Sequence, residues 1–155
     1  MNDVIVGLGS NIEPEYNLHE ALRRLAGLVK IEAVSSLWET AAVGSDGPAF
    51  LNAAALLITP YDAIYLKENV LWVVETSLGR VRTADKNAPR TIDLDILVFN
   101  QEVIDKAIFH LDHLILPLAE LVPDLHDPET EKSMQELAVE HCCKPTAMRV
   151  GKFLY

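Results

Sequence analysis

The sequence is poor in cysteine and in positive charge. Its 155 residues include two cysteines, Cys142 and Cys143, which are adjacent and therefore cannot join distant segments or form a CxxC metal or redox pair. Thirteen Lys and Arg stand against 23 Asp and Glu, which gives a formal net charge of -10. This balance argues against general binding to nucleic acid or to an anionic membrane surface.

The chain also lacks long apolar runs. No uncharged hydrophobic stretch approaches the roughly 20 residues that span a bilayer, and Met1-Asn2-Asp3 lacks the basic start of a signal peptide. We therefore expect a cytoplasmic monomer without nucleic-acid or membrane partners. Half of the residues are hydrophobic and 23% are charged, which suits one compact domain over residues 1–155.

The order of the apolar patterns predicts an α+β fold. The segment 18–29 has a helical stripe with Asn17 as its cap, 60–78 is a second helix, and Gly79 ends it. The expected strands are 3–8, 31–38, 50–58, 92–99 and 103–104. The third expected helix is 133–141. A doubly wound sheet is disfavoured, because the Gly/Pro loop after residue 38 is too short for a helix. The order β-α-β-β-α-β predicts a ferredoxin-like sandwich, an antiparallel sheet with helices on one face and extra C-terminal elements.

Positive charge is concentrated in one short stretch. Between residues 80 and 90 lie four cations, opposed by a single acid at residue 85. These cations are Arg80, Arg82, Lys86 and Arg90. A solvated loop is one interpretation, but an acidic protein with a single basic loop is also typical of one that binds a small polyanion.

Two carboxylates follow this loop. Asp93 and Asp95 are two residues apart, so on a strand they point to the same side while their apolar neighbours face the core. Like charges this close repel unless a cation lies between them, and such oxygen ligands suit Mg²⁺ bridging to substrate phosphates. A solvent-facing acidic pair is the alternative. The adjacent cationic loop favours phosphoryl chemistry, which needs both metal ions and fixed positive charge.

A glycine motif lies near the start of the chain. Gly7-Leu-Gly9-Ser-Asn11 follows a predicted strand and precedes a helix, as in a dinucleotide-binding motif. Ile12 stands where that motif needs a third glycine. We therefore interpret the motif as a turn that ends the strand.

The segment Lys86-x-Ala-Pro-Arg90-x-x-Asp93-Leu-Asp95 resembles the signature of the 6-hydroxymethyl-7,8-dihydropterin pyrophosphokinase family. This family transfers pyrophosphate from ATP to a pterin alcohol in folate biosynthesis, and it has a ferredoxin-like fold. The resemblance runs in order from residue 4 to about residue 125. It is also carried by residues 7–11, 39–44, 50–54, 78–82 and 102–105.

The resemblance implies a site for ATP and a pterin alcohol. Two Mg²⁺ ions would be held by Asp93 and Asp95, with Phe50 stacking on the pterin and Asn52 as its amide partner. The implied roles are catalytic for Arg80, Arg82, Asp93 and Asp95, nucleotide-binding for Glu75, Lys86, Arg90 and His113, and pterin-binding for Thr40, Val43, Phe50 and Asn52.

Three departures from the family pattern keep other hypotheses open. Asn87 stands where an aromatic residue is usual, and Lys86 where Arg is common. Between His113 and Pro117 the chain lacks an Arg-Gly-Phe-like stretch, which would supply an arginine for phosphate and a second aromatic wall for the pterin. A paralogue that binds ATP or a related pterin with lost or altered transfer is therefore one alternative. A non-catalytic ferredoxin-like ligand-binding module is another.

Overall fold

The centre of the molecule is an antiparallel sheet. The structure is a computed structural model that describes residues 1–41, 47–81, 84, 89–142 and 147–152. The strands are β1 (Asn2–Ser10), β2 (Lys30–Val34), β3 (Ser36–Thr40), β4 (Phe50–Thr59), β5 (Asp93–Phe99), β6 (Glu102–Val103) and β7 (Ala147–Lys152). Their order across the sheet is β6-β5-β1-β4-β3-β7, and β2 also pairs with β4. The strand β1 therefore lies between β5 and β4, which places it at the middle of the sheet.

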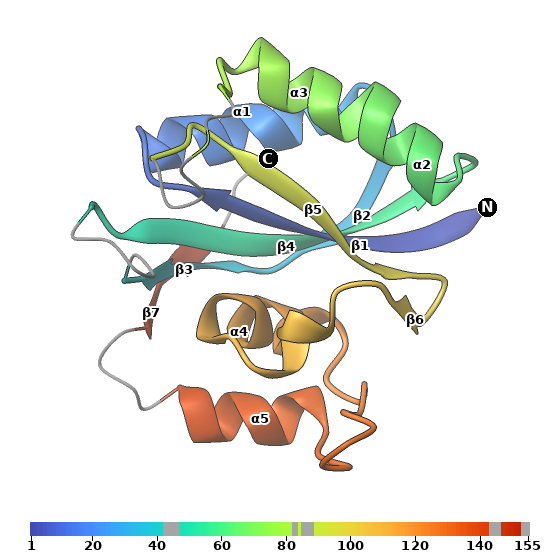
Figure 1. Ribbon diagram of the computed structural model, residues 1–155, viewed down its shortest axis with the longest axis vertical. Helices are drawn as coiled ribbons and strands as arrows, with labels where there is room; N and C mark the ends of the chain where they lie inside the picture. Colours follow the sequence, from blue (N-terminus) through green and yellow to red (C-terminus); the bar gives the residue numbers. More distant parts are fainter. Residues whose placement is uncertain (42–46, 82–83, 85–88, 143–146, 153–155) are drawn as a thin grey trace.

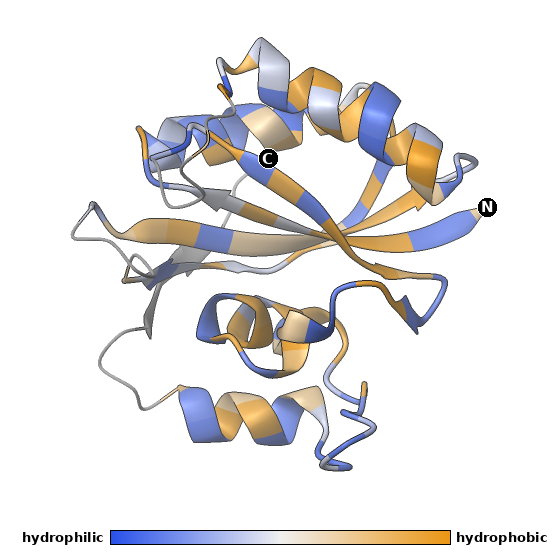
Figure 2. Cartoon of the chain, in the orientation of Figure 1, coloured by the Kyte–Doolittle hydropathy of each residue, from blue (hydrophilic) through white to orange (hydrophobic). Residues whose placement is uncertain are grey.

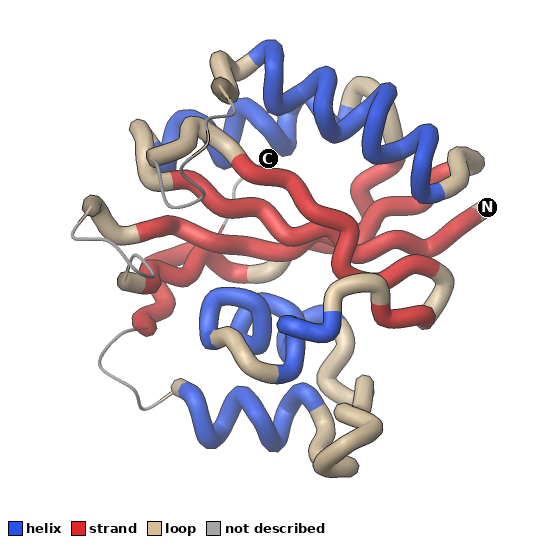
Figure 3. The backbone as a smooth tube through the Cα atoms, in the orientation of Figure 1, coloured by secondary structure: helices blue, strands red, loops and turns tan. Residues whose placement is uncertain are grey.

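Helices cover both faces of this sheet (Figure 1; Figure 3). One face carries α1 (Pro14–Ala26) and a continuous helix made of α2 (Ala63–Leu66), the π-helical turn η1 (Lys67–Leu71) and α3 (Trp72–Ser77). The other carries the 3-10 helix η2 (Lys106–Phe109) and α4 (Asp112–Leu121), with α5 (Met134–His141) packed on the outer side of α4. The expected ferredoxin-like α+β fold is confirmed, but the prediction of helices on one face only is wrong, because the C-terminal elements η2 and α4 cover the second face. Within the described residues, every helix is too short or too polar to cross a membrane.

Each face of the sheet has its own hydrophobic core. Along β1, Val4, Val6 and Leu8 pack beneath α1 and α3, whereas Ile5 belongs to the core beneath α4. This division follows from the alternation of side chains along a strand. Helix α4 is hydrophobic over most of its length (Figure 2), because the sheet covers one side of it and α5 the other.

Several element boundaries differ from those predicted. Asn17 lies inside α1, where its side-chain amide donates to the carbonyl of Ile12, so it does not cap the helix. The expected strand 31–38 divides at Ser35, which is buried and whose hydroxyl accepts from the Ala54 amide of β4. The helix predicted from Pro60 begins at Ala63, because the Asp62 side chain caps it by accepting from the Tyr65 amide at 2.8 Å.

Gly79 ends the α3 helix as predicted. Its φ of 82° lies in the left-handed region that favours glycine. The Gly79 amide donates to Thr76 and the Arg80 amide to the carbonyl of Glu75, both at 3.0 Å, which is the Schellman pattern of a helix end. The turn therefore fixes where Arg80 leaves the helix.

The C-terminal side contains both predicted and unpredicted elements. The expected helix 133–141 is confirmed as α5, capped by the Ser133 hydroxyl, which accepts from the Glu136 amide at 3.1 Å. Helix α4 and strand β7, which pairs with β3, were not predicted. Helix α4 matters most for function, because it forms one wall of the pocket described next.

Candidate functional site

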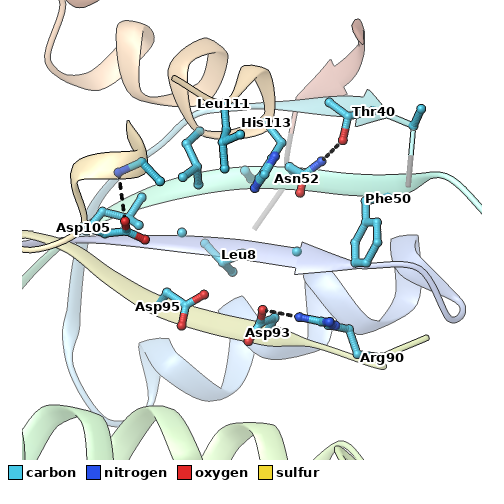
Figure 4. Close-up of a pocket in the computed structure, with 17 residues that line it drawn as sticks. Leu8, Thr40, Phe50, Asn52, Arg90, Asp93, Asp95, Asp105, Leu111 and His113 are labelled. Carbon is cyan, nitrogen blue, oxygen red and sulfur yellow. Dashed lines mark hydrogen bonds and ion pairs between the residues drawn. The ribbon is translucent and has the colours of Figure 1, made fainter. Parts of the chain in front are cut away.

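A pocket of about 320 Å³ lies on the α4 side of the sheet (Figure 4). This volume is within the range of small-molecule sites. Among the residues expected from the sequence, those that line it are Thr40, Phe50, Asn52, Arg90, Asp93, Asp95 and His113. The strands and the start of α4 thus bring together residues from four separate parts of the chain.

The floor of the pocket is a strip of β1 without side chains. Gly9 pairs with Asn52 on β4 and with Asp93 on β5, and Gly7 pairs with Asp95. A Cβ on Gly9 would lie 3.2 Å from Oδ1 of Asn52 and 3.9 Å from the Phe50 ring. Glycine therefore leaves an open surface between the amide on one strand and the carboxylates on the next. The motif is therefore not the strand-ending turn that the sequence predicts: β1 continues through Gly9 to Ser10, and Gly9 lies on the pocket floor.

The β4 side of the pocket presents an oriented amide and an aromatic ring. The Asn52 side chain is 5% exposed, and its Nδ2 donates to Oγ1 of Thr40 at 2.7 Å. This bond holds the amide so that its Oδ1 faces Gly9. Phe50 lies two residues before Asn52 on β4 and therefore on the same face of the strand. A flat heteroaromatic ring with N–H donors suits such a combination of aromatic face and amide oxygen.

Arg90 links the two sides of the site. Its Nη1 lies 2.9 Å from Oδ2 of Asp93, and its guanidinium lies 5.8 Å from the centre of the Phe50 ring. Its backbone is held by Asn11, whose Oδ1 accepts from the Arg90 amide at 2.7 Å and whose own amide donates to the Arg90 carbonyl. The end of the glycine motif thus fixes the end of the basic loop, a pairing that the sequence pattern did not reveal.

Three carboxylates lie at the other end of the pocket. Asp105 joins Asp93 and Asp95 there, and its Oδ1 accepts from the Ala107 amide at 3.0 Å, which caps η2. Desolvation in the pocket, followed by the charges of Asp93 and Asp105, raises the pKa of Asp95 to about 6. Asp105 was not among the predicted site residues, although it lies in a segment, 102–105, that resembles the family.

The carboxylates suit a metal that arrives with a phosphate ligand. In the part of the chain that the structure describes, no three His, Cys, Asp or Glu side chains are grouped closely enough to hold an ion by themselves. Mg²⁺ commonly uses one or two carboxylates together with substrate phosphates and water, rather than a cage of protein ligands. The pair Asp93 and Asp95 fits such an ion, because desolvation and the charges of Asp93 and Asp105 raise the pKa of Asp95, and a bound cation would offset both effects.

Arg80 lies outside the pocket lining but acts on it. Its positive charge lowers the pKa of Asp95 against the larger effects that raise it. Its Nε and Nη1 are buried and have no hydrogen-bond partner among the described residues. Buried donors without a partner are costly, so these two atoms are suited to an anion that the described residues do not supply.

Glu75 is placed differently from the pocket residues. Its side chain is 2% exposed and does not line the pocket, and its Oε2 accepts from the Leu94 amide at 3.0 Å. Leu94 lies between Asp93 and Asp95, so this bond supports the strand that carries both aspartates. The expected nucleotide contact of Glu75 stays a prediction.

The α4 wall combines a histidine with aliphatic side chains. His113 comes from the first turn of α4, and Leu111 and Leu114 flank it in the pocket. Burial lowers the pKa of His113, although the neighbouring carboxylates oppose this effect. The imidazole is therefore neutral near pH 7 and suited to hydrogen bonding rather than to acting as a fixed cation.

Three predicted site residues lie outside the described residues: Val43, Arg82 and Lys86. Asn87, one of the departures from the family pattern, lies outside them as well. Their proposed roles rest on the sequence alone.

Comparison with known proteins identifies one family. Residues 5–123 match the family described as 7,8-dihydro-6-hydroxymethylpterin-pyrophosphokinase (HPPK). The chain is 36% identical over 138 residues to 2-amino-4-hydroxy-6-hydroxymethyldihydropteridine pyrophosphokinase of Pseudomonas aeruginosa, covering 81% of this chain and 84% of the relative. It is 31% identical over 150 residues to the protein of that name from Synechocystis, covering 90% and 76%.

Solved structures agree on the fold. A crystal structure of Plasmodium falciparum HPPK-DHPS superposes with a TM-score of 0.72 over 96% of this chain, at 14% identity. The match covers 46% of that protein, so the present chain spans about half of its length.

Proposed function

The chain belongs to the 7,8-dihydro-6-hydroxymethylpterin-pyrophosphokinase family, and from this we propose that it transfers pyrophosphate from ATP to 6-hydroxymethyl-7,8-dihydropterin. The products are the pterin diphosphate and AMP. The observation that carries the proposal is the register across three strands, in which Asn52, Gly9 and Asp93 lie side by side. This register joins a surface suited to a flat ring to carboxylates suited to a metal-bound triphosphate.

The pterin ring occupies the surface over Gly9. Phe50 offers an aromatic face, and Oδ1 of Asn52 accepts from ring N–H groups, since its Nδ2 is already bonded to Thr40. Val43 is part of this proposed subsite by resemblance. The hydroxymethyl group then points along β1 towards the aspartates, where the transfer takes place.

The triphosphate lies at the carboxylate end. Arg80 supplies buried donors without a partner among the described residues. Arg90 is held at the same end of the pocket by its ion pair with Asp93. Arg82 and Lys86 add charge from the loop, and His113 contributes a neutral hydrogen-bonding group. Two Mg²⁺ ions held by Asp93 and Asp95 would supply charge neutralisation at the phosphates.

The reaction needs no covalent protein intermediate. The pterin hydroxyl oxygen attacks the β-phosphorus of ATP, the bond from this phosphorus to the α-β bridging oxygen breaks, and AMP leaves with that oxygen. The hydroxyl proton passes to solvent or to a pocket group. The protein contributes alignment of the two substrates and positive charge around the moving group.

The proposal is tested by measuring AMP formed from ATP and Mg²⁺, with and without 6-hydroxymethyl-7,8-dihydropterin. Mass spectrometry of the pterin diphosphate identifies the product. AMP that forms only with the pterin supports the proposal. ATP binding without AMP formation under these conditions contradicts it.

A second candidate is a paralogue that binds ATP or a related pterin with altered transfer. It is favoured by the α4 wall, where Leu111 and Leu114 are aliphatic and η2 and α4 bring no arginine into the pocket. Screening other alcohols for AMP release and product mass separates the two candidates.

We also propose that residues 1–155 act as one pterin pyrophosphokinase-like domain, as a cytoplasmic monomer. The composition, which is that of one globular domain, and the formal net charge of -10 support this. Light scattering of the purified chain tests the monomer.

A further inference from the structure

The first turn of α4 forms part of the pocket. His113 and Leu114 both come from this turn and both line the pocket. The preceding residue, Leu111, occupies the N-cap position and provides no side-chain hydrogen bond to the helix. The position of His113 therefore depends on contacts made elsewhere in this turn.

One such contact comes from α5. Oδ1 of Asp112, the first residue of α4, lies in short hydrogen-bonding contact with Nδ1 of His141, the last residue of α5. The two side chains are only 20% and 14% exposed. Because the carboxylate oxygen accepts, Nδ1 of His141 carries the hydrogen. An acid at a helix start and a histidine at a helix end are both favourable placements for the helix dipoles.

The packing of α5 directs His141 to this place. Leu137 lies one helical turn earlier and is buried in the core shared by α4 and α5, as is Met134. Residues four apart share a helix face, so His141 continues the face that α5 turns towards α4. The polar contact is thus the end of a largely apolar interface.

We propose that His141 is a positioning residue for the pocket: by binding Asp112 it fixes the first turn of α4, and with it the place of His113. This inference rests on the proposed function, because it assigns His113 a role at the triphosphate. The family match ends at residue 123, and so does not include α5.

The charges around His113 explain how His141 affects the pKa of the His113 ring. Asp112 on α4, Asp105 before η2 and Asp93 on β5 each raise the pKa of His113 against the lowering by burial. Arg90 also lines the pocket, while β1 and β4 contribute uncharged residues there. By donating to Asp112, the ring of His141 weakens the pull of this nearest carboxylate. It therefore favours the neutral imidazole.

The test is an NMR titration of the His113 ring in the free protein, which requires neither ligand nor turnover. In His141→Ala, Asp112 loses the hydrogen bond from His141 and acts more strongly on His113, so the pKa of His113 rises by about half a unit. In Asp112→Asn, the carboxylate is removed, and the pKa falls by a similar amount. The matched control is His126→Ala, because His126 is an exposed histidine away from the pocket, and this variant titrates as wild type.

Kinetics supply the second readout. His141→Ala lowers kcat about tenfold with less than about a threefold change in KM for the pterin, because His113 acts on the moving phosphates. His141→Asn keeps a donor near the position of Nδ1 and restores kcat to within about twofold. An unchanged His113 titration in both His141→Ala and Asp112→Asn overturns the proposal, even if the melting temperature falls. Absence of AMP formation in the wild type contradicts the proposed function instead and leaves the titration decisive for His141.

Discussion

The face of the sheet beneath α1 and α3 is filled with side chains, whereas the face beneath α4 holds an open pocket over the same strands. Along β1, Val4, Val6 and Leu8 pack on the filled face, while Gly7 and Gly9 leave the pocket floor bare. The filled face supplies stability and holds the strands in register. That register is what places functional groups beside one another on the open face. Adjacent residues on one strand should therefore differ in whether substitution harms the fold or the reaction.

The largest effect is expected on the open face, at Asp95. In Asp95→Asn, AMP formation falls by at least about 1000-fold, because the proposed site loses a carboxylate that would hold the phosphate-bound Mg²⁺. The fold survives, since Asp95 is exposed and makes no core contact. The matched control is Asp124→Asn, because Asp124 is an exposed carboxylate after α4. Activity of Asp95→Asn within about tenfold of wild type would contradict the proposed site.

Leu94 directly precedes Asp95 on β5, and its side chain lies on the opposite face of the sheet. It is 3% exposed in the core beneath α3, so Leu94→Ala costs about 2–5 kcal/mol of unfolding free energy. Urea denaturation measures this loss. At a temperature where the variant is folded, its kcat stays within about threefold of wild type. Loss of turnover without loss of stability would remove the contrast between the two faces.

Substitution of Gly9 tests whether the pterin lies against the part of β1 that has no side chains on the pocket floor. In Gly9→Ala, the added Cβ lies 3.2 Å from Oδ1 of Asn52, in space assigned to the pterin, so KM for the pterin rises about tenfold. Stability changes by less than about 1 kcal/mol, because alanine suits a strand at least as well as glycine does. Gly27→Ala, after α1, is the matched control. Equal KM values for these two variants would show that the pterin does not rest on Gly9.

The smallest effect concerns the charge of Asp95 in the free protein. Its folded pKa of about 6 lies above its usual value of 3.8, so ionising it destabilises the folded state. This cost is fully present above pH 6 and disappears as the pH falls towards 4. Wild type therefore gains stability relative to Asp95→Asn between pH 7.5 and pH 4.5, by less than about 1 kcal/mol because Asp95 is exposed to solvent. Urea denaturation without Mg²⁺ measures this difference. A loss of wild-type stability relative to Asp95→Asn over the same pH range would contradict the raised pKa of Asp95.

The filled face was the easier one to predict from the sequence. The helical spacing of Leu18, Leu22 and Leu25 and the runs in β1, β4 and β5 follow directly from burial on one side. The alternation that places Asp93 and Asp95 on one side also predicted their meeting in the pocket. These features are local, so they can be read from periodicity.

The open face depends on contacts between distant segments. Helix α4 is short, apolar on nearly all sides and contains Pro117, so it shows neither an amphipathic stripe nor a clear start signal. The role of Gly9 arises from its pairing with Asn52 and Asp93, and that of Asn11 from its bonds to Arg90. Asp105 enters through the turn before η2. No spacing within one segment could have predicted these pairings.

The most direct test of the account follows the phosphorus atoms of ATP. The protein is incubated with the pterin, Mg²⁺ and ATP labelled in turn at the α-, β- and γ-phosphate. Pyrophosphoryl transfer moves the β- and γ-labels to the pterin product in equal amounts, while the α-label stays in AMP. Transfer of the γ-label alone, with ADP as the other product, would contradict it.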